Sequence, residues 1–375
     1  MLRKIFISAI ETSGDLHAAR LAAALQRLAR GKIKFSGFGG ESLRETGVEI
    51  LADLTSRSTV GLLEPLRHLP AYFCALNKLK KYLRRNRPDL FLCVDGQGFN
   101  LPAAQYAKKL DIPVVYYISP QEWLWGTPAA GKKVAAVCDL IISIFPGEHA
   151  FYKKLGGHSV YNGHPLSEIV ARHVETQYTA SLHAADKPLV ALFPGSRRQE
   201  LANLLPVFRQ IVKLSRGREQ FVIAAASAYC LKTLRKQIKN IPVVYGENYA
   251  LLAAADIVLS ATGTITLEAA LLGTPIIAVY KFPKFSYWLI NKLLAKKIPK
   301  YKALPNMLAG KEIMPERIQD FTAESLYRLL TATLYNEKKL QKIKTEFRKL
   351  SARLSAKDVL KKNAAAVLGL LEVKS

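Results

Sequence analysis

The chain has 375 residues, half of them hydrophobic, and it carries a formal net charge of +26. This length favours two domains, and the composition provides enough apolar surface for sizeable cores, which excludes a disordered chain. Four cysteines without a C-x-x-C pair argue against a disulfide framework or a structural zinc site. No run reaches the roughly 20 apolar residues that span a bilayer, and the N-terminal run is too short for a signal peptide, so we expect a cytoplasmic protein.

Short β-rich runs alternate with helical patterns through the first half of the chain. A helix is expected from about Asp15 to Arg30. Strands are expected at Lys4–Ala9, Lys34–Phe38, Leu90–Val94, Pro113–Ile118 and Leu140–Phe145. This βαβ repetition predicts a parallel sheet with helices on both faces.

The alternation restarts after a polar linker, which we expect over residues 166–186. The strands expected beyond it are Leu189–Phe193, Gln220–Ala225, Pro242–Tyr245, Ile257–Ser260 and Pro275–Val279. Two consecutive sheets predict an α/β fold with two Rossmann-like, doubly wound domains that face each other across a cleft. We place the N-terminal domain at residues 1–165, the C-terminal domain at residues 187–345 and a C-terminal helical tail at residues 346–375.

Two dense basic blocks also contain apolar residues. They span Tyr72–Arg87 and Lys281–Lys302. Basic residues interleaved with Trp, Phe and Leu suit an anionic membrane surface, and nucleic acid is the other class of partner for such charge. We favour the membrane surface because the sequence has no nucleic-acid-binding motif. Two ordinary amphipathic helices with solvated lysines are the alternative.

A phosphate-binding turn is predicted where Thr262-Gly263-Thr264 follows an apolar run and opens a helical pattern. A strand, a tight turn and a helix start in this order direct backbone N–H groups and the positive end of the helix dipole to one place. Glu268, one turn into the helix, is placed to accept hydrogen bonds from a sugar. The segment therefore predicts a socket for a nucleotide diphosphate.

A second candidate turn, Pro194–Arg197, lies between the strand ending at Phe193 and a helical pattern. Gly195 allows close approach of the backbone to an anion, Ser196 offers a hydroxyl, and Arg197 can bind phosphate oxygens through two N–H groups. A plain βα turn with a surface arginine is the alternative. The neighbouring phosphate-binding turn strengthens the functional interpretation.

In the first half, Asp95 lies where a predicted strand ends, which is where a general base facing a cleft would be placed. A turn-forming Asp before Gly is the alternative. Glu11–Asp15 opens the first helix, so Ser13 or Asp15 is either an N-cap or part of the cleft. Gly37–Gly40 lacks the spacing of a dinucleotide fingerprint, and no histidines have metal-ligand spacing, so we predict no cofactor and no metal.

Taken in order, these segments resemble the lipid-A-disaccharide synthase family, and the resemblance covers nearly the full length. The matching segments are Ser13–Asp15, Gly37–Gly40, Thr59–Glu64, Pro88–Asp89, Val94–Asp95, Phe99–Asn100, Tyr117–Trp125, Phe145–Tyr152, Gly163–His164, Phe193–Arg197, Thr262–Thr264, Leu267–Glu268 and Leu304–Asn306. The family has the two-Rossmann-domain GT-B glycosyltransferase fold. The resemblance implies inverting, metal-independent transfer of a sugar from UDP-2,3-diacylglucosamine to 2,3-diacylglucosamine 1-phosphate.

The resemblance also implies roles for individual residues. Asp95 matches the proposed base that deprotonates the acceptor 6-hydroxyl. The residues that match the UDP donor side are Ser196, Arg197, Gly263, Thr264, Glu268 and Asn306. The residues expected on the acceptor side are Glu11, Ser13, Asp15, Glu64 and Asn100. An apolar run at Val60–Leu76 would face lipid acyl chains, or alternatively form a buried helix.

The chain departs from the family pattern on the acceptor side. Gly98 stands where the family usually has a second Asp, Ile10 stands where the opening motif has Gly, and Gly126 stands where Arg follows the tryptophan pair. Two other functions therefore stay open: a UDP-GlcNAc 2-epimerase-like isomerase, and a non-catalytic relative that binds a UDP-sugar or the membrane. We expect a peripheral protein on the cytoplasmic face of the inner membrane; a homodimer is one assembly that the sequence leaves open.

Overall fold

The computed structural model describes residues 2–55, 69–124, 126–174, 187–282 and 300–373. Glu64 lies outside these residues. So do the part of the run Val60–Leu76 that precedes Leu69 and most of the basic block Lys281–Lys302. The chain forms two compact units, one comprising residues 1–165 and 356–375 and the other residues 166–355. Among the described residues, no helix is long and apolar enough to cross a membrane.

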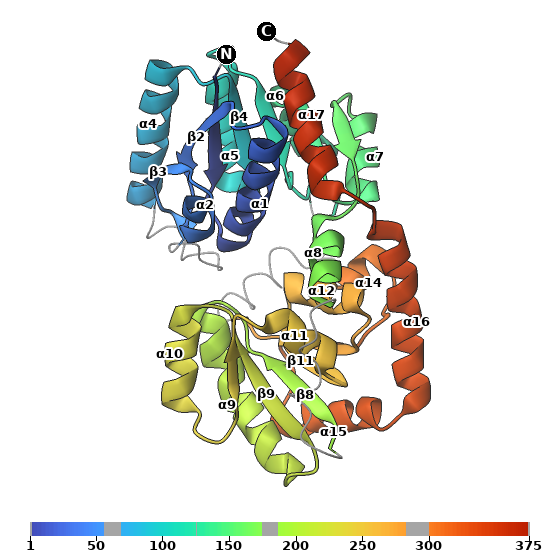
Figure 1. Cartoon of the computed structure of the whole chain (residues 1–375). Coiled ribbons are helices and arrows are strands. Elements are labelled where there is room, and N and C mark those ends of the chain that lie inside the picture. The colour runs from blue at the N-terminus through green and yellow to red at the C-terminus, as the bar shows by residue number, and fades with distance from the viewer. Residues whose placement is uncertain (1, 56–68, 125, 175–186, 283–299, 374–375) are drawn as a thin grey trace. The chain divides into compact units, whose positions relative to one another are not determined.

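The first unit is built on a seven-stranded parallel sheet with the order β3-β2-β1-β4-β5-β6-β7 (Figure 1). Its strands are β1 (Arg3–Ala9), β2 (Ile33–Phe38), β3 (Glu49–Ala52), β4 (Leu90–Val94), β5 (Val114–Tyr117), β6 (Leu140–Ser143) and β7 (Ser159–Tyr161). Its helices are α1 (Thr12–Leu28), α2 (Glu41–Glu45), α4 (Leu69–Asn86), α5 (Gln97–Lys108), α6 (Pro128–Val137), α7 (Pro146–Lys154) and α17 (Val359–Val373). The order changes direction between β1 and β4, so the loops after these two strands lie at a topological switch point.

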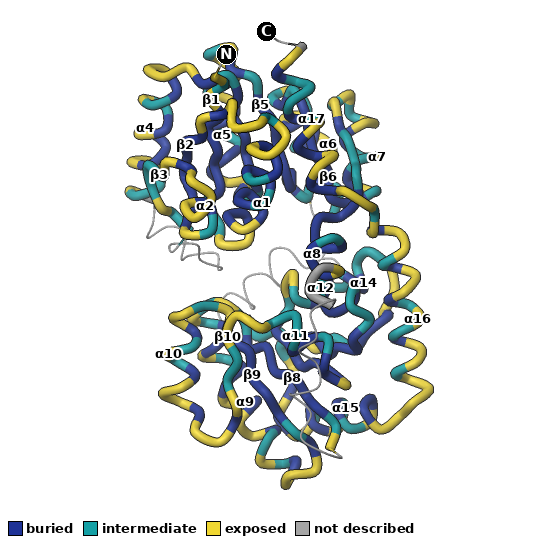
Figure 2. The backbone as a smooth tube through the Cα atoms, in the orientation of Figure 1, coloured by how far each residue is buried: buried dark blue, intermediate teal, exposed yellow. Residues whose placement is uncertain are grey.

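Helices cover both faces of this sheet, as expected for parallel strands that are buried on both sides (Figure 2). On one face, α4 to α7 pack on a core that contains Phe6, Phe91 and Phe99, all almost fully buried. On the other face, α1 lies beside α17. Asn162 and Asn363 share a hydrogen bond of 3.0 Å, which ties α17 to the end of β7. The C-terminal helix is therefore part of the first unit.

The second unit is built on a six-stranded parallel sheet with the order β10-β9-β8-β11-β12-β13. Its strands are β8 (Leu189–Phe193), β9 (Gln220–Ala225), β10 (Val243–Tyr245), β11 (Ile257–Ala261), β12 (Ile276–Tyr280) and β13 (Glu316–Ile318). Its helices are α8 (Pro165–Val174), α9 (Arg198–Ser215), α10 (Ala228–Gln237), α11 (Asn248–Ala254), α12 (Thr264–Leu272), α14 (Leu304–Ala309), α15 (Ala323–Leu334) and α16 (Glu337–Leu354). α9, α10 and α15 pack on a core that includes Phe208 and Leu330.

The predicted fold class is confirmed, and each strand expected from the sequence is present within one or two residues. Three edge strands, β3, β7 and β13, lie outside the expected ranges; all are short, and β13 begins with the charged pair Glu316-Arg317. The residues expected to form one helical tail are divided between the units, because α16 ends at Leu354 and the chain then returns to the first unit.

Candidate functional site

Asp95 lies directly after β4, in a turn made by two successive residues with left-handed backbone. Its φ is +53° and that of Gly96 is +56°. This conformation is uncommon for a residue with a side chain and is found where the surroundings fix it. The carboxylate is half-buried, and its Oδ1 accepts a hydrogen bond of 2.8 Å from the amide of Gly96. The turn therefore holds a carboxylate at the carboxyl edge of a central strand.

Asn100 is the residue that fixes this turn, although the sequence predicted that it would contact substrate. Its side chain is fully buried. Its Oδ1 accepts from the Ser8 hydroxyl at 2.6 Å, and its Nδ2 donates to the carbonyl oxygens of Asp95 at 2.7 Å and Ser8 at 3.1 Å. A buried amide whose partners are Ser8 in β1 and the Asp95 turn links these two segments and is used within the protein. We propose that Asn100 positions Asp95.

Asp15 has a comparable structural position. Its carboxylate is buried and accepts from the amides of Gly40 at 2.6 Å and Ser42 at 3.0 Å, which lie at the N-terminus of α2. Burial raises the pKa of this carboxyl, and the hydrogen bonds from α2 oppose the shift. Ser13 is exposed and Glu11 is half-buried at the start of α1. Of the three predicted residues, Asp15 therefore ties α1 to the N-terminus of α2, and the other two lie closer to the solvent.

A second carboxylate, Glu122, lies near the Asp95 turn and was not identified from the sequence. It is buried, it accepts a short hydrogen bond from the side chain of Gln97, and it accepts from the amide of Thr127 at 3.2 Å. A Cβ atom on Gly126 would lie 1.6 Å from its Oε2, so glycine is needed at position 126 while Glu122 adopts this position. At Gly98, an added Cβ would meet nothing within 4 Å. Gly98 and Gly126, two of the three departures from the family pattern, thus have different surroundings.

Glu148 is a third buried carboxylate of the first unit. It is fully buried in the first turn of α7 and accepts from the amides of Ile144 at 2.8 Å and Phe145 at 3.2 Å, and from the Ser119 hydroxyl. Burial raises the pKa of this carboxyl to about 7, against the effect of its hydrogen bonds. Ser119 follows Ile118, a β-branched residue held at a φ of +55°. The loop after β5 is therefore a constrained segment.

In the second unit, the loop after β8 binds the carboxylate of Glu200, whereas the sequence predicted that it would bind the phosphate of a ligand. Gly195 has a φ of +104°, and a Cβ there would lie 2.2 Å from Oε2 of Glu200. This Oε2 accepts from the amides of Ser196 at 2.9 Å and Arg197 at 3.2 Å. Oε1 of Glu200 pairs with the Arg197 guanidinium at 3.1 Å. Glycine at position 195 therefore allows the Glu200 carboxylate to lie close to the backbone of this loop.

The N-terminus of α12, after the adjacent strand β11, is different. Gly263 is its N-cap and makes no side-chain capping hydrogen bond, and the first turn contains no acidic residue. Gly263 and Thr264 are exposed, and a Cβ on Gly263 would meet nothing within 4 Å. Glu268 lies half-buried farther along the helix. Because β8 pairs with β11 through Phe193 and Ser260, the two predicted loops are neighbours at one edge of the sheet.

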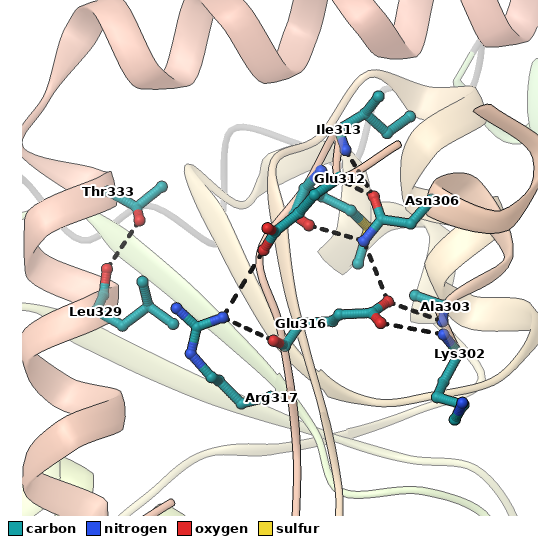
Figure 3. Close-up of polar contacts among 10 residues, drawn as sticks. Lys302, Ala303, Asn306, Glu312, Ile313, Glu316, Arg317, Leu329 and Thr333 are labelled. Carbon is teal, nitrogen blue, oxygen red and sulfur yellow. Dashed lines mark hydrogen bonds and ion pairs between the residues drawn. The ribbon is translucent and has the colours of Figure 1, made fainter. Parts of the chain in front are cut away.

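Asn306 is fully buried, and its amide group is completely used within the second unit (Figure 3). Its Oδ1 accepts from the amides of Ile313 at 2.7 Å and Met314 at 3.0 Å. Its Nδ2 donates to the Met314 carbonyl oxygen at 2.9 Å and to Oε2 of Glu316 at 3.1 Å. A side-chain amide has two donor hydrogens and two acceptor lone pairs, so none remains for the direct donor contact that the sequence predicted. We propose instead that Asn306 fixes this loop.

The residues missed from the sequence are mostly carboxylates that accept hydrogen bonds from helix N-termini. Glu316 accepts from the amides of Lys302 and Ala303, both at 3.0 Å, just before α14. Glu200 had a detectable signal, since an acid three residues after an N-cap forms a capping box. Glu316 and Glu122 carried no such signal in the sequence, because their hydrogen-bond partners are distant in the sequence or belong to an irregular loop. Among the described residues, no group of three or more His, Cys, Asp or Glu is arranged to hold a metal ion.

The chain matches known proteins over nearly its whole length. A family model described as lipid-A-disaccharide synthetase matches residues 5–368. The lipid-A-disaccharide synthase of Geobacter metallireducens is 32% identical over 382 residues, which cover 99% of this chain and 98% of that protein. The structure of a Neisseria meningitidis UDP-GlcNAc 2-epimerase bound to UDP-GlcNAc is similar, with a TM-score of 0.61, 13% identity and coverage of 99% and 100%. MurG of Acinetobacter baumannii has a TM-score of 0.55, 16% identity and coverage of 98% and 99%.

The buried amide of Asn306 leads to a stability prediction. Replacing Asn306 with Ala leaves two backbone N–H groups and the Glu316 carboxylate with fewer partners, and we expect a loss of about 2–4 kcal/mol in the unfolding free energy. Chemical denaturation measures this loss. Asn306→Asp should be no better at neutral pH, because it places a second carboxylate against Glu316. The exposed control Asn336→Ala should lose only its cap, about 1 kcal/mol. An Asn306→Ala protein as stable as wild type would contradict the assignment.

Glu148 leads to a prediction about pH. Its pKa in the folded state is about 7, above the ordinary carboxyl value of 4.5, so the folded protein binds more protons than the unfolded chain between these values. The stability contributed by protonated Glu148 should therefore be present below about pH 4.5 and be lost as the pH rises through 7, by on the order of 3 kcal/mol.

The matched variant is Glu148→Gln, which stays neutral. Urea unfolding of both proteins from pH 5 to pH 8 gives the difference in stability. We expect wild type to lose stability relative to the variant over this interval. A difference that does not change with pH would show that Glu148 does not titrate there.

Proposed function

This chain belongs to the lipid-A-disaccharide synthase family, and we propose that it transfers 2,3-diacylglucosamine from UDP-2,3-diacylglucosamine to 2,3-diacylglucosamine 1-phosphate and releases UDP. The observation that carries this proposal is the match to the family model over residues 5–368. The epimerase alternative has weaker support, because the epimerase likeness at 13% identity is one of fold.

The proposed reaction is a displacement at the anomeric carbon of the donor. The acceptor 6-hydroxyl oxygen forms a bond to this carbon on one face while the bond to the UDP oxygen breaks on the other, which inverts the configuration. The hydroxyl proton passes to the carboxylate of Asp95, and the electron pair of the broken bond stays on the diphosphate. Asp95 suits the role of base because a constrained turn holds its half-buried carboxylate at the end of β4.

The second unit is proposed to bind the UDP moiety. The N-terminus of α12, whose N-cap is the exposed Gly263, supplies backbone amides and the positive end of a helix dipole to the diphosphate. Arg197, whose side chain is 39% exposed, supplies a cation on the neighbouring loop that neutralises the leaving group. Glu268 is the proposed acceptor for the hydroxyls of the ribose. The remaining predicted contact, Ser196, is exposed on the same loop as Arg197.

The acyl chains of both substrates require the enzyme to reach a membrane surface, and α4 is the part that we propose to face it. Its buried side packs Leu76, Leu79 and Leu83 on the core of the first unit. Phe73 is 56% exposed, and Lys81, Arg84 and Arg85 are exposed on the outer side. An exposed aromatic residue beside several cations suits a surface of anionic lipid. The site of action would be the cytoplasmic face of the inner membrane.

The role of Asp95 is tested by Asp95→Asn. The amide keeps the size of the side chain and cannot take a proton, so we expect kcat to fall by about 10²–10⁴-fold. Because the proposed UDP contacts are in the second unit, the Kd for UDP should change by no more than about twofold. Product formation is measured by mass spectrometry with both lipid substrates in EDTA, and the Kd by calorimetry.

Asp111→Asn is the matched control for this experiment, since Asp111 is an exposed carboxylate of the first unit that has no proposed role in the site. If Asp95→Asn weakens UDP binding as much as it slows turnover, Asp95 is not the base. If wild type binds UDP and forms no disaccharide, the proposed acceptor is wrong.

The membrane proposal is tested by reversing three charges on α4 with Lys81→Glu, Arg84→Glu and Arg85→Glu. We expect binding to phosphatidylglycerol vesicles to weaken by at least about tenfold, since each cation near an anionic surface contributes about 1 kcal/mol. The matched control reverses three exposed charges on α16, at Lys338, Lys342 and Arg348. Equal losses in the two variants would show that net charge, and not α4, determines the binding measured in a sedimentation assay.

A further inference from the structure

Two helix N-termini lie side by side in the second unit, and they differ in whether an acidic side chain of the same helix binds their first amides. α9 begins after β8 and α12 begins after β11, and these strands are paired. Both helices would attract an anion by their dipoles and their first backbone amides. At α9, the amides of Ser196 and Arg197 are bound to the buried carboxylate of Glu200. At α12, the N-cap is Gly263, which has no side chain, and the first turn contains no acidic residue.

The same carboxylate also holds the cation of the loop. Oε1 of Glu200 is 3.1 Å from Nη1 of Arg197, and the side chains are 7% and 39% exposed. A pair with one buried partner and three hydrogen bonds on one carboxylate is more constrained than an exposed ion pair. Arginine has five N–H donors in a planar group, so binding through Nη1 leaves other donors for a ligand. Among the described residues, Glu200 is the acid that pairs with this guanidinium.

We propose that Glu200 is a positioning residue for the donor. It takes up the amides of α9 and fixes the Arg197 guanidinium, so that the diphosphate is received by Arg197 and the N-terminus of α12. This inference rests on the proposed function, since it concerns how the same UDP moiety is held. The two loops look equivalent in the sequence, and the proposal gives them different roles. The loop before α12 binds the diphosphate through its backbone, and the loop before α9 binds it through Arg197, which Glu200 holds in place.

Loss of Glu200 would change the site in two ways. The Arg197 side chain would lose its partner and regain rotamer freedom, which has to be lost again when the ligand binds. The two α9 amides would also become available, and a helix N-terminus without an acid attracts a phosphate. Glu200→Gln has nearly the size of the original, and its carbonyl oxygen can still accept from the amides that Oε2 binds, so it removes the charge with little change of shape.

The test is a double-mutant cycle on UDP binding, measured by calorimetry with UDP alone. We expect Glu200→Gln to raise the Kd by about tenfold and Arg197→Ala to raise it by at least as much. In the Arg197→Ala background, Glu200→Gln should add less than a further twofold, because Glu200 acts through Arg197. The matched control is Glu324→Gln, an acid in the first turn of α15, which should leave the Kd unchanged.

Three results would overturn the proposal. A Kd that does not change in Glu200→Gln shows that the pair does not position the guanidinium. Tighter binding of UDP shows that Glu200 competes with the diphosphate for the α9 amides. Equal factors for Glu200→Gln in both backgrounds show a role that is independent of Arg197, such as helix capping alone. If wild type does not bind UDP at all, the proposed function itself fails, and with it the premise of this inference.

Discussion

The hydrogen bond between a carboxylate and the backbone amides at a helix N-terminus is the interaction on which both halves of this molecule depend. In a parallel α/β fold, every helix that follows a strand begins at the carboxyl edge of the sheet, where its first amides have no partner within the helix. Asp15 binds the amides of α2, Glu148 those of α7, Glu200 those of α9 and Glu316 those before α14. These internal acids fix the loops that form the candidate sites.

Some of the described helices lack an acid in the first turn, among them α5 in the first unit and α12 in the second. An acid at each N-terminus would neutralise the helix dipoles and leave the edge of the sheet without attraction for a diphosphate. At α12, a glycine N-cap and a first turn without acids leave these amides exposed. In the first unit, Asn100 holds the Asp95 turn, and the Asp95 carboxylate itself accepts from the amide of Gly96, the N-cap of α5. The proposed role of Asp95 as base therefore depends on its place at the end of β4 and not on the absence of a backbone partner.

The alternation of strands and helices was predictable, because β-branched runs bounded by Gly, Pro and polar residues carry a local signal. The positions of Asp95 after β4, of Arg197 after β8 and of Thr264 after β11 were also predictable, since each follows a central strand of its own parallel sheet. Their roles toward substrate stay predictions. What could not be predicted was the use of each polar side chain. Asn100 and Asn306 occur in motifs that suggested substrate contact. Their side-chain amides instead bind backbone groups of other residues in the same unit, and only three-dimensional packing decides this. The edge strand β13 was missed because three residues that begin with a charged pair carry no alternation.

The central claim is that Glu200 binds the amides of α9 while the N-terminus of α12 receives the diphosphate. Hydrogen exchange of backbone amides, measured by NMR with and without saturating UDP, tests it most directly. The account predicts that the amides of Ser196 and Arg197 are protected before UDP is added, and that protection at Gly263 and Thr264 rises on binding. Rapid exchange at Ser196 and Arg197 without UDP, with protection appearing there on binding and none at Gly263 and Thr264, would contradict it.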